Sequence, residues 1–274
     1  MIIRRFIKNK LSLIGLVIVL LLIITALVAP LIAPHDPLKI SISNRISPPS
    51  REHLLGTDQF GRDLLSRILF GTKVSLEVGL YSTLLGAMIG IMLGCVGGYF
   101  GGWIDHIVVL IIDTIISFPA TLLAIGLMAV VGPNLENIII ALSIIGIPRY
   151  ARVVRGVVLS IREKEYIEAS KALGSGNLKT ILIHILPNSM APLIIVGTIG
   201  VANAILIEAA LSFLGLGVPP PAPSWGNILA DGRNYLTQAP WMTIFPGIAI
   251  SIIVLGFNTL GDGLRDVLDP KLKQ

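Results

Sequence analysis

The chain has 274 residues, of which 54% are hydrophobic and 14% are charged, whereas an average soluble domain has about 25% charged residues. This composition excludes a single soluble core, and several apolar runs reach the ~20 residues needed to cross a bilayer. We therefore predict a polytopic membrane protein. A basic cytoplasmic face explains the formal net charge of +5, so we expect a lipid bilayer as partner and no nucleic acid.

Cysteine and histidine usage indicates neither crosslinks nor bound metal. Cys95 is the one cysteine, which excludes a disulfide within the chain. The four histidines are scattered and show no metal-site spacing. We expect no metal site and no cofactor.

The first apolar run covers residues 11–33 and follows Arg4, Arg5, Lys8 and Lys10. A signal peptide also starts with basic residues, but its apolar region is about 7–15 residues long. The longer run favours an uncleaved first transmembrane helix.

Taken in chain order, the apolar runs predict an all-α bundle of six transmembrane helices. They cover residues 11–33, 75–98, 104–131, 135–152, 190–212 and 241–261. Six crossings put both termini on one side. Most of the 21 basic residues lie in the two termini and in residues 149–188, so the positive-inside rule places these segments in the cytoplasm.

We expect two parts, divided between residues 74 and 75. Residues 1–74 hold the first transmembrane helix and an external loop. Residues 75–274 form a core of five transmembrane helices, with a cytoplasmic loop at 153–188 and an external loop at 213–240. The external segments are rich in proline, which interrupts helices, although residues 59–71 have the apolar spacing of a short helix. They form either a lid over the bundle or a docking surface for an external protein.

Several polar residues and glycines in the spans suggest specific roles. Asp113, about 10–15 Å into the third span, either lines the pathway or is a structural acid, and Glu208 in the fifth span has the same two interpretations. Pro119 is expected to kink the third span, and Glu77 is expected to be an interfacial residue.

Three arginines follow the fourth span: Arg149, Arg152 and Arg155. They either contact anionic headgroups or pair with a partner's carboxylates. Small residues at about four-residue spacing favour close helix packing over a hinge: Gly86, Gly90, Gly94, Gly97 and Gly98.

Residues 163–187 form a polar interruption between apolar runs. A helix is predicted up to Leu173, with Tyr166 and Ile167 on its apolar face. Gly174 follows at the position of a left-handed C-cap. A second helix is predicted over 177–186, ended by Pro187. The apolar face must be buried on lipid headgroups or in a protein groove.

This segment resembles the EAA loop of ABC importer permeases. Glu168, Ala169 and Ser170 are followed after three residues by Gly174, and after nine more by His184-Ile185-Leu186-Pro187. Ser170 replaces an alanine of the family pattern, and His184 with Asn188 is typical of the peptide/nickel branch. The resemblance implies a coupling helix, with Glu168, Ala169, Ser170, Gly174, Leu186 and Pro187 forming the contact to an ATPase subunit.

Three further segments resemble the dipeptide/oligopeptide/nickel permease family, C-type transmembrane subunit. They are His53–Arg67, Gly98–Asp105 and Glu208–Gly217, the last followed by Ser224-Trp225-Gly226. One departure is Leu110, where many members carry an arginine three residues before the acid at 113. The resemblance implies a multi-pass protein of a bacterial or archaeal cell membrane that carries di/oligopeptides, with nickel or glutathione as alternatives. Its implied partners are a homologous second permease, two ATP-binding subunits at the cytoplasmic loop and an external solute-binding protein.

Catalysis is not expected of this chain. It has no Gly-x-x-x-x-Gly-Lys-Ser/Thr phosphate loop, so ATP hydrolysis is assigned to separate chains. An intramembrane enzyme would need nucleophile–base or metal-ligand groups that the spans do not offer. An ion-coupled secondary transporter would have no use for a cytoplasmic docking helix.

Overall fold

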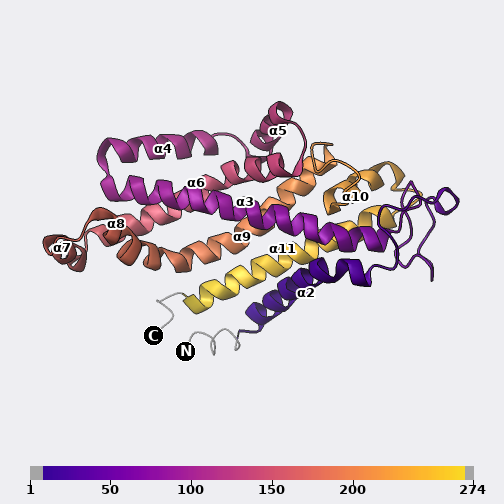
Figure 1. Ribbon diagram of the computed structural model, residues 1–274, viewed down its shortest axis with the longest axis horizontal. Helices are drawn as coiled ribbons and strands as arrows, with labels where there is room; N and C mark the ends of the chain where they lie inside the picture. Colours follow the sequence, from indigo (N-terminus) through magenta and orange to yellow (C-terminus); the bar gives the residue numbers. More distant parts are fainter. Residues whose placement is uncertain (1–8, 269–274) are drawn as a thin grey trace.

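The computed structural model describes residues 9–268, and in that range the regular secondary structure is helical, with one isolated bridge between Thr57 and Asp63 and no strand (Figure 1). The predicted all-α fold is therefore confirmed. The basic residues expected at the extreme termini, such as Arg4 and Lys271, lie outside the described residues.

Five helical segments are long and apolar enough to cross a membrane, and a bent pair of helices provides a sixth crossing. The five contain α2 (Lys10–Ile32), α3 (Leu64–Phe100), α6 (Leu135–Arg162), α9 (Leu186–Phe213) and α11 (Trp241–Leu268), and the bent pair is α4 (Gly102–Ile116) with α5 (Ala120–Val131). Each of the six predicted spans corresponds to one of these segments.

The third span is broken rather than kinked. The axes of α4 and α5 differ by 89°, and Pro119 immediately precedes α5. Proline has no backbone N–H and crowds the preceding turn, so α4 ends at Ile116 and the chain restarts in a new direction. The prediction of one continuous helix over 104–131 was wrong, although the position of the break was predicted.

The helix α3 begins well before the predicted second span. Asp63 is its N-cap, with the side chain accepting hydrogen bonds from the backbone N–H of Ser66 at 2.8 Å and from its hydroxyl at 2.7 Å. Residues 64–71 are therefore the first turns of α3, and the prediction of a separate short helix over 59–71 was wrong. The helix also passes without a break through the boundary expected between residues 74 and 75.

Glycines let α3 pack tightly along α6. A Cβ at Gly86, Gly90 or Gly94 would lie 2.5–2.8 Å from a backbone carbonyl oxygen of α6, and one at Gly98 would lie 2.9 Å from Val158. Real Cβ atoms do not approach so closely, so only glycine allows this separation. The predicted role of this glycine stripe in helix packing is confirmed.

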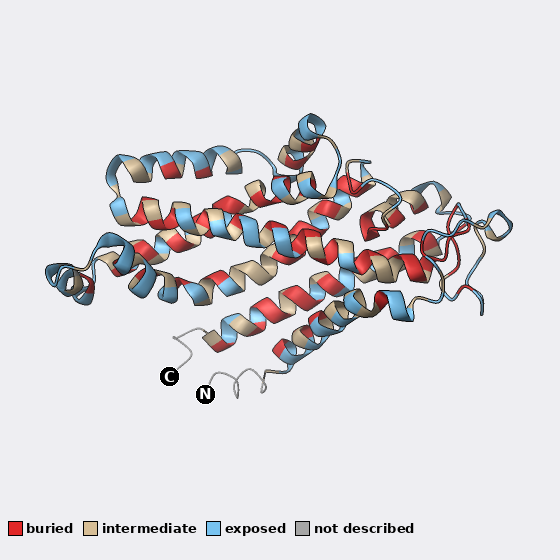
Figure 2. Ribbon diagram, viewed as in Figure 1, coloured by how far each residue is buried: buried red, intermediate tan, exposed pale blue. Residues whose placement is uncertain are grey.

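The helices α2 and α11 lie side by side along one edge of the bundle (Figure 1). Near the described ends of the chain, Asn9 donates a hydrogen bond to Asp266 at 3.0 Å. Much of α2 and α4 is exposed in the isolated chain (Figure 2). Leucine and isoleucine dominate these faces, so lipid or partner chains must cover them.

The two proline-rich segments, residues 33–63 and 214–240, together form what we call the loop cap. It lies at the opposite end of the bundle from residues 163–187 (Figure 1). Asp58 pairs with Arg62 at 2.6 Å and Arg67 at 3.4 Å, and all three are nearly inaccessible. Trp225, at the start of α10 (Trp225–Gly232), donates to the carbonyl of Ile68 at 2.9 Å. The polar residues of the His53–Arg67 motif thus hold the cap together.

Candidate functional site: the coupling segment and the central cavity

The helix α7 (Glu165–Ala172) protrudes from one end of the bundle (Figure 1). Only Ile167 of its predicted apolar face is buried, with 0% exposure, whereas Tyr166 is 45% exposed. Glu168 and Ala169 are exposed and Ser170 is half-buried. The helix therefore buries one side chain in the bundle, and most of its surface is exposed and can meet a partner.

The end of α7 has the geometry predicted for it. Gly174 has φ +82°, in the left-handed region, and the N–H of Ser175 donates to the carbonyl of Ser170 at 3.1 Å. This is the 6→1 bond of a Schellman C-cap. A Cβ at Gly174 would meet nothing within 4 Å, so glycine is needed here for its backbone conformation and not for space.

The chain from Asn177 to Phe213 is one helical segment. The helix α8 (Asn177–Thr180) leads into a π-helical turn, η2 (Ile181–Ile185), and then into α9. The prediction that Pro187 ends a separate helix was wrong. A wider, π-helical turn comes directly before the proline, and in it the N–H of Leu186 donates to the carbonyl of Ile181. Asn188 adds a side-chain bond to the carbonyl of His184 at 2.6 Å.

The coupling segment, residues 163–187, is fastened to the bundle at three places. Ile167 packs in a buried cluster that also contains Ile185 and Tyr150. The rings of Tyr166 and His184 meet edge-on with centroids 5.8 Å apart. In addition, the Tyr99 hydroxyl near the end of α3 donates to the side chain of Asn177 at 3.0 Å.

The structure brings the predicted coupling residues to one end of the molecule. Glu168, Ala169 and Ser170 lie on α7 and Gly174 at its C-cap, while Leu186 and Pro187 lie at the start of α9. Leu186 is half-buried and Pro187 is exposed. Asp113 and Glu208 lie elsewhere in the bundle.

Arginines of α6 pair with acids of α4, an outcome the sequence analysis did not foresee. Arg155 binds Asp105 through two hydrogen bonds of 2.6 and 2.7 Å. Arg152 binds Asp113 at 2.7 Å, with both side chains more than half exposed. Asp113 thus finds its cation on another helix, in place of the arginine missing at position 110. Neither headgroups nor partner carboxylates are required to pair these two arginines.

Glu208 is fully buried near the loop cap, with 0% exposure. One carboxylate oxygen accepts a hydrogen bond from the Ser212 hydroxyl at 2.7 Å. The other has no hydrogen-bond partner among the residues that the structure describes. Glu77, expected to be an interfacial residue, lies 3.9 Å from the exposed Lys73.

Two of the four histidines, which are scattered in the sequence, lie close together in the loop cap beside Glu52. His35, Glu52 and His53 each offer a ligand atom within 4.8 Å of the others. However, His53 is already engaged at both ring nitrogens. Nδ1 lies 2.9 Å from Asp63 and Nε2 lies 3.3 Å from the Asn44 amide. These contacts give His53 a structural role in the cap.

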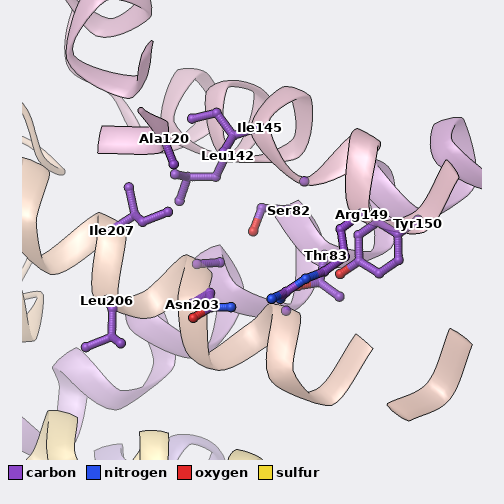
Figure 3. A pocket seen from close by; sticks show the side chains of 13 residues that line it. Ser82, Thr83, Ala120, Leu142, Ile145, Arg149, Tyr150, Asn203, Leu206 and Ile207 are labelled. Atoms are coloured by element: carbon purple, nitrogen blue, oxygen red, sulfur yellow. The ribbon is translucent and has the colours of Figure 1, made fainter. Parts of the chain in front are cut away.

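Sequence reasoning missed a central cavity of about 450 Å³ between α3, α6, α9 and the start of α5 (Figure 3). One stripe of α6 lines it at positions 142, 145, 146 and 149, and one stripe of α9 at positions 200, 203, 204 and 207. Both stripes have the i, i+3, i+4, i+7 spacing of a single helix face. The small or polar residues Gly146, Arg149, Gly200 and Asn203 within apolar runs were the available signal.

Comparisons with known proteins connect this architecture to a family. The family model described as the binding-protein-dependent transport system inner membrane component matches residues 86–274. The chain belongs to that family. A second family model, the N-terminal TM domain of oligopeptide transport permease C, matches residues 1–49. The chain is thus the membrane-spanning permease subunit of an ABC importer, a multi-pass protein of the inner membrane.

Curated relatives match over nearly the whole chain. The dipeptide transport system permease protein DppC of Alkalihalophilus pseudofirmus is 47% identical over 97% of this chain and 88% of its own length. The protein of the same description from Escherichia coli is 46% identical over 98% of this chain and 92% of its own. The di/tripeptide transport system permease protein DppC of Pseudomonas aeruginosa is 42% identical over 98% and 91%.

The fold also matches a solved ABC transporter. A chain of the inward-facing MetNI methionine ABC transporter superposes with a TM-score of 0.60 at 22% identity, covering 75% of this chain and 98% of that one. This likeness concerns the fold alone. Membership of the family implies that such a subunit works together with an ATPase, a second permease and a substrate-binding protein. It is also consistent with a subunit that catalyses no reaction itself.

Proposed function

We propose that this chain is the C-type permease subunit of a di/oligopeptide importer, and that residues 163–187 couple it to the ATPase. Relatives more than 40% identical are described as peptide permeases. The observation that carries the coupling role is the shape of α7, a helix with a defined C-cap, one buried anchor at Ile167 and otherwise exposed residues. An exposed helix of this kind suits insertion into a groove of another protein.

We further propose that α7 and both chain ends face the cytoplasm. The described ends of the chain, near Lys10 and Leu268, lie at the same end of the bundle as α7 (Figure 1). Basic residues concentrate there, as they do on cytoplasmic surfaces. The loop cap at the opposite end then faces the external solute-binding protein.

In this proposal, two ATPase subunits act on this chain and on its homologous partner permease. ATP shifts the importer between its states through differential affinity for those states, and it binds on the ATPase chains. A displacement of α7 reaches α9 because Ile167 packs in the same cluster as Ile185. The positions of Asp113 and Glu208 along the translocation pathway stay predictions, and so does the division of the chain at residue 74.

The test is a reconstituted importer containing the wild-type chain or the Glu168→Arg variant. We expect Glu168→Arg to abolish ATP-driven uptake of a labelled dipeptide while the chain still reaches the membrane. Glu165→Arg is the matched control, because both acids lie in the first turn of α7 and favour the helix N-terminus equally. Normal uptake by Glu168→Arg would remove the coupling assignment, and equal losses in both variants would reduce it to an effect on helix stability.

The same vesicles separate the alternative substrates and mechanisms. Uptake of nickel or glutathione instead of dipeptide would change the assigned cargo and leave the coupling role intact. Uptake by the purified chain without ATPase subunits would indicate an ion-coupled secondary transporter.

A further inference from the structure

The central cavity contains a positive charge without a counter-charge. Arg149 lines the cavity from α6 and points into it (Figure 3). Its neighbours Arg152 and Arg155 each bind an aspartate of α4. No hydrogen bond or ion pair joins Arg149 to any residue in the range 9–268 that the structure describes. The guanidinium therefore keeps all of its donors for another molecule.

The other polar groups of the cavity surround the same space. Asn203 lies on the facing stripe of α9, and the hydroxyl residues Ser82, Thr83 and Tyr150 complete the polar part of the lining. Leu142, Ile145, Leu206 and Ile207 form the apolar part. A cavity of about 450 Å³ lies within the range of small-ligand sites, which are mostly apolar with a few placed polar groups.

We infer that this cavity receives the free C-terminal carboxylate of a peptide during its passage, with Arg149 as the residue that binds it. The inference rests on the proposed function, namely that peptides cross through this chain. A guanidinium binds a carboxylate through two parallel hydrogen bonds. The amide of Asn203 adds a donor from the opposite wall, and the apolar residues accommodate the adjoining side chain.

The charge also discriminates between the alternative cargoes. A cavity whose one ionised lining group is Arg149 repels a bare divalent cation and attracts an anion. It therefore favours molecules with a free carboxylate over nickel. A pathway site must also release its cargo, and the openness of Arg149 to solvent keeps the ion pair weak enough for that.

The experiment measures ATP-driven uptake into vesicles holding the complete importer, with binding protein supplied outside. The two probes are a labelled dipeptide and the same dipeptide amidated at its C-terminus. The quantity compared is the free-acid to amide uptake ratio of each variant divided by that of the wild type, so that the binding protein's own preference cancels. We expect Arg149→Gln to lower this ratio by roughly ten-fold, the size expected for a lost charge-assisted bond, and Arg149→Lys to lower it less.

Arg265→Gln is the matched control, because it removes an exposed charge in the last turn of α11, a helix that contributes no residue to the cavity lining, and its ratio should equal that of the wild type. Should Arg149→Gln fail to co-purify with its partner subunits, the ratio in Arg149→Lys and in Asn203→Ala decides, and both must fall. An unchanged ratio in the Arg149 variants, with wild-type uptake intact, overturns the inference alone. Absence of ATP-driven uptake of either peptide by the wild-type importer overturns the proposed function instead.

Discussion

Substitutions at Gly174 separate two explanations for a glycine in the coupling segment. The residue has φ +82° and open space where a Cβ would lie. If backbone conformation is the reason for glycine, alanine costs about 1–2 kcal/mol, enough to reduce the native C-cap population about 5- to 30-fold relative to its alternatives. Asparagine costs less, because it tolerates the left-handed region better than other residues. Proline is excluded, because its ring fixes φ near −65°.

The expected order of ATP-driven peptide uptake is therefore glycine, asparagine, alanine, proline, with Gly174→Pro inactive although the chain is still expressed. The matched control is Gly176→Ala, two residues away. Gly176 also has open space for a Cβ, but its φ of −68° suits any residue, so uptake should stay near the wild-type level. If glycine were needed for close approach of the ATPase, the larger asparagine would be worse than alanine. That reversed order would refute the conformational explanation.

Two further predictions concern the bundle. Asp105→Asn should lower the thermal unfolding midpoint of the purified chain more than Asp113→Asn does. The reason is that the Arg155–Asp105 pair is bidentate and less exposed than the Arg152–Asp113 pair. Equal shifts of the midpoint in the two variants would contradict this ranking. Gly94→Val should destabilise the chain by about 1–3 kcal/mol through overpacking against Ala151 of α6. Gly156→Ala is the control, because it lies at a helical position with open space, and it should be neutral or slightly stabilising. Unfolding of both variants in detergent measures this difference.

The membrane spans were predictable because length and hydropathy suffice to recognise them. Their ends were not, since helices continue beyond the apolar run when local chemistry supports them. Asp63 caps α3 twelve residues before the predicted span starts at 75, and the proline-rich neighbourhood concealed that signal. Pro187 was misread for the opposite reason. A proline normally marks a helix boundary, but here the π turn at 181–185 comes directly before Pro187 and the helix continues into α9.

The first half of the coupling segment, up to Gly174, was predictable because its signals are local. A left-handed glycine after an amphipathic turn is recognisable from adjacent residues, and Gly174 has that conformation. The cavity and the ion pairs are different, because they depend on which helices become neighbours. Arg152 and Asp113 are 39 positions apart, and neither residue type alone indicates the other. Arg149 and Asn203 likewise face one cavity only because α6 and α9 lie on either side of it.

The arrangement of the helices also indicates where motion of α7 would be felt. The helix α9 begins at the coupling segment, lines the cavity with Asn203 and ends near Glu208 at the loop cap, a length of about 40 Å at 1.5 Å per residue. In contrast, α3 and α6 are held together by glycine contacts that leave little room for sliding. A tilt of α9 against this tightly packed pair must therefore change the cavity, because its walls come from both sides. On the proposed function, Arg149 of the carboxylate site lies on α6 and Asn203 on α9, so a tilt of α9 would change the separation of the two groups that hold the peptide.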